Sequence, residues 1–207
     1  MFNRFKELYV DPHIIHWDYY TNYHKNCNTI GLPGGVYGLV FSETMPKPGQ
    51  YPSEFETCVY IGKSTGSGEA GHYIDLKSSL NSMVTSYMYK RMTHHHKPLM
   101  TGDKTYSKGF TQIIEEYGYG RDVLNGTFTS LPLWLCMLIP PPDLDKERIE
   151  RWAYVTEQMQ LYSFEMMWDK TTLGNMDTQP HKDPNSFSYG RMKDFNEQAE
   201  IIERFMV

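Results

Sequence analysis

Cysteine is scarce in this chain of 207 residues, which has three: Cys27, Cys58 and Cys136. An odd number of widely separated thiols gives neither a disulfide framework nor the paired spacing of a zinc site. The pattern is typical of reduced thiols in the cytoplasm. We expect all three cysteines to be packing residues.

Long hydrophobic runs are also lacking. The longest, residues 131–139, falls well short of the ~18–20 apolar residues that a membrane span needs. Charged residues, among them Arg4, Lys6 and Asp11, interrupt the first residues of the chain, so no secretory signal sequence is predicted there. The sequence therefore predicts a soluble, cytoplasmic protein with no membrane partner.

An excess of positive charge is missing too. The chain has 20 Lys and Arg against 25 Asp and Glu, a net charge of −5. This balance excludes a protein that binds nucleic acid through its overall charge, so any DNA-contacting surface must be local. Aromatic and thioether side chains are abundant, with 16 Tyr, 10 Phe, 4 Trp and 13 Met. Such residues fill a core or line a binding surface equally well.

Two strand-like segments follow an irregular start. Residues 35–41 and 57–63 are apolar and rich in β-branched or aromatic residues, and the three prolines of residues 43–55 make the segment between them a loop. Two strands joined in this way pair most readily as an antiparallel hairpin, which needs no crossover helix.

The rest of the chain predicts an α+β fold. Apolar residues at helical spacing follow residue 80 until Pro98, and the run 131–139 is typical of a buried strand. A long helix is expected over residues 146–168, and residues 99–130 are expected to form a loop. We divide the chain into an N-terminal arm at 1–34, a domain at 35–175, and a tail with a short helix at 176–207.

The two hairpin strands carry the tripeptides Gly35-Val36-Tyr37 and Tyr60-Ile61-Gly62. With them the chain resembles the GIY-YIG nuclease superfamily. The resemblance implies a β-β-α-β-α core, in which a small mixed or antiparallel three-stranded sheet is flanked by helices. It covers about residues 35–175, to which the arm and the tail are added as extensions.

The resemblance implies that Tyr37 and Tyr60 line an active site and that one of them helps to activate water. A free phenol has a pKa near ~10, so it is a poor base at neutral pH unless a nearby cation favours its deprotonation. Lys63, directly after Gly62, is a candidate for that cation. The alternative is that these are ordinary packing tyrosines and a strand-end lysine.

Arg91 and His95 are spaced to lie on one face of the first predicted helix. The resemblance implies that the arginine stabilises charge on a phosphate and that the histidine assists proton transfer. A guanidinium suits paired phosphate oxygens. His94 and His96 flank the candidate, and an exposed histidine run at the end of a helix is the alternative interpretation.

Glu157 shares the apolar stripe of the second predicted helix with Ala153 and Phe164. The resemblance implies a metal-binding glutamate on this helix and an asparagine after it, for which the candidate is Asn175. Mg²⁺ accepts one or two protein carboxylates and keeps several waters, so one glutamate suffices for Mg²⁺ or Mn²⁺. Glu165 stays open as the rival, because its spacing to Asn175 is shorter.

These residues imply a metal-dependent endonuclease that hydrolyses phosphodiester bonds of double-stranded DNA, of a restriction-like or phage-type kind, in a bacterial or phage-infected cell. A homodimer would match the symmetry of a duplex. The alternatives are a nucleic-acid-binding module that does not cut and a protein whose tyrosines and methionines merely pack. Candidate DNA-contacting segments are the arm, the tail, residues 43–56 with Lys47, and residues 97–122 with Lys97, Lys104, Lys108 and Arg121.

Overall fold

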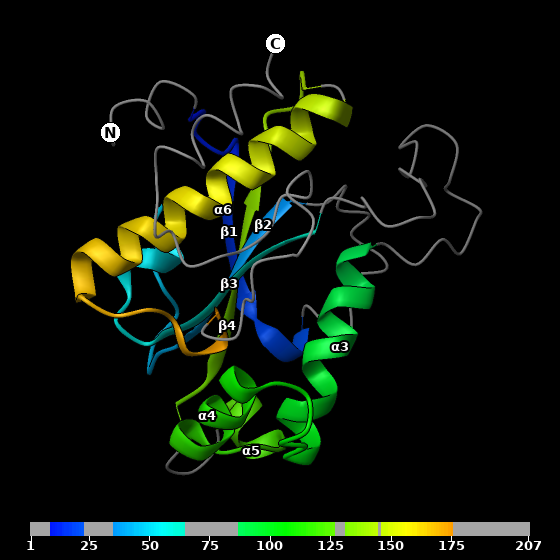
Figure 1. The fold of residues 1–207 in the computed structure, drawn as a ribbon, viewed down its shortest axis with the longest axis vertical. Helices are drawn as coiled ribbons and strands as arrows, with labels where there is room; N and C mark the ends of the chain where they lie inside the picture. The colour runs from blue at the N-terminus through cyan, green and yellow to red at the C-terminus, as the bar shows by residue number, and fades with distance from the viewer. Residues whose placement is uncertain (1–8, 23–34, 65–86, 127–130, 145, 176–207) are drawn as a thin grey trace.

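The computed structural model describes residues 9–22, 35–64, 87–126, 131–144 and 146–175 (Figure 1). They form an α+β fold with one four-stranded sheet. In chain order the elements are β1 (Ile14–Tyr19), β2 (Gly35–Phe41), η1 (Pro52–Glu54), β3 (Cys58–Ser64), α3 (Tyr87–Thr101), α4 (Lys108–Tyr117), α5 (Arg121–Asn125), β4 (Leu133–Ile139), α6 (Lys146–Trp168) and η2 (Leu173–Asn175).

The predicted hairpin is confirmed. β2 and β3 pair antiparallel, with Tyr37 opposite Gly62 and Val36 opposite Lys63. The two tripeptides therefore lie side by side toward the open end of the hairpin, away from the loop that joins its strands. The strand order is β1-β4-β2-β3, so β3 is one edge of the sheet.

The inner strand β4 confirms the buried strand predicted from the apolar run. It pairs antiparallel with β2 on one side and with β1 on the other. Strand β1 was not expected, because it lies within the predicted arm and makes the sheet four-stranded rather than three-stranded. Its residues Ile15, Trp17 and Tyr19 alternate with the polar His16 and Asp18, but Trp17 alone is buried, so the strand is held mainly by backbone pairing to β4.

Helices pack on both faces of the sheet. Side chains of β2, β3 and β4 alternate between two cores, except at a bulge in β3, where Val59 and Tyr60 both belong to one core. One core includes residues of α3, α4 and α5, and we call this side the α3 face. The other core includes residues of α6, and we call it the α6 face. Figure 1 shows α3, α4 and α5 (green) grouped together and α6 (yellow) apart from them.

The region between Pro98 and β4 differs from the expected loop. Helix α3 continues through the buried Pro98 to Thr101, although proline removes one helical hydrogen bond. Helices α4 and α5 follow. The N-cap Ser107 and the buried Phe110 and Ile113 at helical spacing are the sequence signals for α4.

The second long helix is confirmed as α6, with the bounds expected for it. The predicted helix near the end of the tail lies outside the described residues. So do residues 80–86, the predicted start of the first helix. None of the helices in the described part of the chain combines the length and apolar character that crossing a membrane requires.

Two of the three cysteines confirm the prediction that they are packing residues. Cys58 and Cys136 are buried as free thiols in the core of the α6 face. Burial raises the pKa of both thiols, so both are protonated and unreactive at neutral pH. Cys27 lies outside the described residues.

Candidate active site

A phenol and an imidazole meet inside the α3 face. The hydroxyl of Tyr37 on β2 lies 2.8 Å from Nε2 of His95 on α3. Tyr37 is 0% exposed and His95 is 2% exposed, so bulk water does not compete for this hydrogen bond. A pair of this kind can pass a proton from one residue to the other.

Tyr60 on β3 completes this cluster. Its ring centroid lies 4.8 Å from that of His95 and 5.7 Å from that of Tyr37. Phe110 of α4 stacks on the imidazole at 4.9 Å, with the planes 7° apart. Of the three consecutive histidines it is therefore His95 that faces both tyrosines, whereas His94 is exposed. We call Tyr37, Tyr60 and His95 the phenol–imidazole cluster.

Gly62 lets the two tyrosines lie against the backbone of β3. A Cβ atom at this position would lie 2.5 Å from Cε1 of Tyr60 and 2.9 Å from the hydroxyl of Tyr37. Those distances are shorter than van der Waals contact, so any other residue would displace the rings. The last glycine of the second tripeptide is thus required by the cluster itself.

Replacing Gly62 with alanine is expected to lower the free energy of unfolding by about 1–3 kcal/mol, the usual cost of overpacking. It should also change the ring signals of His95 in NMR spectra. The matched control is Gly38→Ala, whose Cβ would lie 2.3 Å from Cβ of Pro52. That clash is on the α6 face, so a similar loss of stability should leave the His95 signals in place. Equal disturbance of His95 by both variants would contradict the assigned role of Gly62.

Lys63 and Glu157 meet on the opposite side of the hairpin. Nζ of Lys63 lies 3.7 Å from Oε2 of Glu157, and Glu157 is 1% exposed. The ammonium also lies 4.4 Å from the ring centroid of Tyr154. Burial, and then the charge of Glu157, raises the pKa of Tyr154, which stays a neutral phenol. The carboxylate is compensated by a lysine, which is what burying a charge requires.

The sequence predicts Lys63 beside the two tyrosines, but in the structure it lies on the other face of the hairpin. Its register partner is Val36, whereas the partner of Tyr37 is Gly62. Because side chains alternate along a strand, Lys63 lies with Ile61 on the α6 face. The ammonium therefore pairs with Glu157 across the sheet from the phenol–imidazole cluster.

Glu157 is also the candidate for holding a metal ion. Within the described residues no group of three or more His, Cys, Asp and Glu side chains is arranged to bind a metal. A buried carboxylate is nevertheless a hard oxygen donor of the kind that Mg²⁺ takes singly. The 3.7 Å to Lys63 exceeds a hydrogen-bond distance. The donor chemistry fits Mg²⁺ or Mn²⁺, with the ion taking the place of the Lys63 ammonium as the positive charge beside Glu157.

The rival Glu165 accepts a hydrogen bond from Thr171.

Asn175 holds the edge of β3. Its Oδ1 accepts from the Ile61 N–H at 2.9 Å, and its Nδ2 donates to the Ile61 carbonyl at 2.8 Å. Thr172 donates a further hydrogen bond to the same Oδ1. The asparagine side chain thus takes the place of another strand beside the second tripeptide. In this arrangement Asn175 positions Tyr60 and Gly62 through the backbone.

Asn175→Ala is expected to lower the free energy of unfolding by about 1–3 kcal/mol, because both Ile61 backbone groups lose the partner seen in the structure. Amide hydrogen exchange of Ile61 should accelerate. The control is Asn125→Ala, which removes an exposed hydrogen bond from Thr21 and should cost little. Urea unfolding measures both variants. Slow exchange at Ile61 in Asn175→Ala would show that this edge does not depend on the asparagine.

Three further features concern residues predicted to contact substrate. Arg91 belongs to α3, one turn before His95, and its side chain lies outside what the structure describes.

The basic candidates within the described chain are exposed: Lys47, Lys97, Lys104, Lys108 and Arg121. Sequence reasoning missed Tyr106, whose hydroxyl lies 3.5 Å from Nδ1 of His95.

The structure thus brings the predicted site residues into two groups, the phenol–imidazole cluster on the α3 face and the Lys63–Glu157 pair on the α6 face. No protein-family model, curated protein or solved structure matches this chain. The chemistry of these two groups is therefore the basis for assigning a function.

Proposed function

We propose that this protein is a metal-dependent DNA endonuclease, with the GIY-YIG type of active site that its tripeptides resemble. The observation that carries the proposal is the 2.8 Å contact between the Tyr37 hydroxyl and His95 Nε2. A buried phenol needs a hydrogen-bond partner, and an imidazole is a partner that can also take its proton. The pair is suited to general base catalysis, in which a side chain takes a proton from attacking water.

In the proposed reaction His95 makes Tyr37 a better base. Nε2 of the imidazole accepts the phenol proton, and the phenolate then accepts a proton from water as the water oxygen attacks phosphorus. Because Tyr37 is 0% exposed in the free protein, substrate binding is proposed to bring this water to its hydroxyl. Tyr60 lies against both groups and limits their movement. Arg91, one turn before His95 on the same helix, is proposed to stabilise the negative charge of the transition state.

Glu157 is proposed to hold the metal ion. When bound, Mg²⁺ or Mn²⁺ polarises the scissile phosphate and stabilises the leaving oxygen. Lys63, 3.7 Å from Glu157, carries a positive charge that would suit a phosphate held beside the ion. The two groups lie on opposite faces but at neighbouring register positions of β2 and β3. The scissile phosphate is therefore proposed to bind at the open end of this hairpin, where it can be approached from either face.

Double-stranded DNA is the proposed substrate. Lys97, Lys108 and Arg121 are exposed on or beside α3, α4 and α5, on the side of the phenol–imidazole cluster, and Lys104, which pairs with Glu115, lies with them. Such residues contact phosphates and fix the position of a duplex without reading its sequence. A homodimer with one site per chain is proposed to cut both strands.

A DNA-binding protein that does not cut is the second candidate. Two observations favour it: Lys63 already neutralises Glu157, and Asn175 hydrogen-bonds the backbone of Ile61. Under this alternative, the protein binds DNA without a metal ion, with an affinity that falls as salt rises.

The test is to incubate the full chain with plasmid and phage DNA in Mg²⁺, in Mn²⁺ and in EDTA. The endonuclease predicts discrete fragments with either metal and none in EDTA, and Arg91→Ala should abolish them. Binding that is salt-sensitive and metal-independent, with every DNA left intact, would establish the second candidate. Absence of both cutting and binding would contradict both.

A further inference from the structure

His95 lies between two phenols of different exposure. Its Nε2 meets the hydroxyl of the fully buried Tyr37 at 2.8 Å, and its Nδ1 meets that of Tyr106 at 3.5 Å. The second contact is at the long end of hydrogen-bond distances, so it is the weaker of the two. Tyr106 is 40% exposed. Its hydroxyl can therefore hydrogen-bond to the imidazole and to solvent together.

The packing of Tyr106 directs it toward His95. Its ring meets Phe110 edge-on, with centroids 5.1 Å apart. Phe110 in turn stacks on the imidazole. The Tyr106 and His95 rings are nearly perpendicular, at 85°, so the phenol approaches the imidazole by its edge. One ring of α4 thus supports both partners of the contact.

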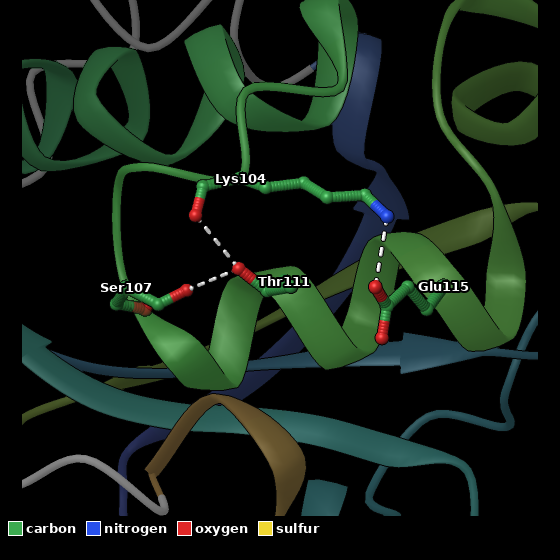
Figure 2. Close-up of polar contacts among 4 residues, drawn as sticks. All are labelled: Lys104, Ser107, Thr111 and Glu115. Atoms are coloured by element: carbon green, nitrogen blue, oxygen red, sulfur yellow. Dashed lines mark hydrogen bonds and ion pairs between the residues drawn. The ribbon is translucent and has the colours of Figure 1, made fainter.

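The turn that carries Tyr106 is held on both sides (Figure 2). Thr111 of α4 donates to the carbonyls of Lys104 and Ser107, both at 2.9 Å. Lys104 also pairs with Glu115 at 2.8 Å. Ser107 caps α4 by accepting from a backbone N–H of its first turn. The backbone at Tyr106 is therefore fixed independently of the contact with His95.

A neutral imidazole has one N–H donor and one acceptor nitrogen. If the proton is on Nδ1, it is donated to Tyr106, and Nε2 accepts from Tyr37 while the Tyr106 proton reaches solvent. If the proton is on Nε2, the imidazole donates to Tyr37 and Nε2 cannot accept the phenol proton. A phenol O–H is a stronger donor than an imidazole N–H, so the shorter contact, at Nε2, favours Tyr37 as the donor there. The first arrangement therefore fits the two distances and leaves His95 able to take the proton of Tyr37.

We propose that Tyr106 is a positioning residue that holds the proton of His95 on Nδ1, so that Nε2 is the acceptor for Tyr37. Its role in cleavage rests on the proposed function, since only there does Tyr37 lose its proton during a reaction. The proton balance is simple: the O–H bond of Tyr37 breaks as an N–H bond forms at Nε2. The resulting imidazolium donates through Nδ1 to Tyr106, which spreads its charge toward solvent.

The test compares Tyr106→Phe with Tyr119→Phe, which loses another exposed phenol, near Gly102. Long-range ¹H–¹⁵N spectra of the full chain, without metal or DNA, report which nitrogen of His95 is protonated. His95→Gln identifies the signals. The wild type and Tyr119→Phe should show the proton on Nδ1, and Tyr106→Phe a mixture of both forms. Cleavage by Tyr106→Phe should be about three- to tenfold slower, the value of one neutral hydrogen bond.

A proton on Nε2 in the wild type, or an unchanged form in Tyr106→Phe, would overturn the inference even if the protein cuts DNA. A shifted form with an unchanged cleavage rate would overturn the role of Tyr106 in the reaction. If the spectra change as expected but no DNA is cut by any variant, the endonuclease proposal fails and the position of the His95 proton stands. The two failures are thereby distinguishable.

Discussion

Tyr37→Phe is expected to cut DNA at least about 100-fold more slowly than the wild type, in line with the contribution of a positioned acid or base. The substitution keeps the ring and removes only the hydroxyl that lies 2.8 Å from Nε2 of His95. The ring should keep its place beside Tyr60, because the core of the α3 face surrounds it. The rate constant of a single turnover, with enzyme in excess over DNA, measures the loss without interference from product release.

Tyr20→Phe is the matched control for this prediction. Tyr20 is also 0% exposed, and its hydroxyl donates to the carbonyl of Met92 on α3 at 2.9 Å. Both variants lose a buried hydrogen bond between a phenol and α3, at a cost of about 1 kcal/mol in stability. Only Tyr37→Phe should lose cleavage. An equal loss in Tyr20→Phe would show that the buried phenols act through the packing of α3.

Glu157→Gln is expected to abolish metal-dependent cleavage, with a loss of more than about 100-fold, because outer-shell groups of a metal site alone account for 10–100-fold. Mg²⁺ should raise the melting temperature of the wild type, since a ligand of the folded state stabilises it, but not that of the variant. The ion pair with Lys63 is lost as well. Breaking a buried pair costs about 3 kcal/mol, so thermal unfolding in EDTA should show a lower melting temperature.

Glu165→Gln tests which carboxylate of α6 holds the metal ion. Glu165 is half-buried and accepts a hydrogen bond from Thr171. It should keep both the cleavage rate and the effect of Mg²⁺ on melting. If the losses occur in Glu165→Gln instead, Glu165 is the metal ligand. If Glu157→Gln is less stable but cuts DNA normally, Glu157 serves only to pair with Lys63.

Much of the hairpin could be predicted from the sequence. The tripeptides mark the strands, the prolines between them mark the loop, and pairing then places Tyr37 opposite Gly62. The direction of Lys63 was also available, since alternation puts it with Ile61 and away from Tyr60. Lys63 directly follows the tripeptide in the sequence, but neighbouring residues of a strand point to opposite faces, so it cannot lie beside Tyr37 and Tyr60.

Other parts of the site depend on long-range contacts that no local pattern encodes. Asn175 reaches Ile61 because η2 lies against the edge of β3. Tyr106 reaches His95 because α4 packs beside α3, whereas the sequence alone predicts a loop there. For Asn175 and Tyr106 the partner, and not the segment, determines the structure. Strand β1 is different, because Ile15, Trp17 and Tyr19 alternate with polar residues, a strand signal too short to stand out from the irregular residues around it.

The central claim is that Tyr37 and His95 act as one acid–base unit, and a double-mutant cycle tests it most directly. Single-turnover cleavage is measured for Tyr37→Phe, His95→Gln and the double variant. Residues that work as a unit are not additive, so the double variant should be no more than about threefold slower than the slower single variant. Losses that multiply in the double variant would contradict the claim, because each residue would then contribute without the other.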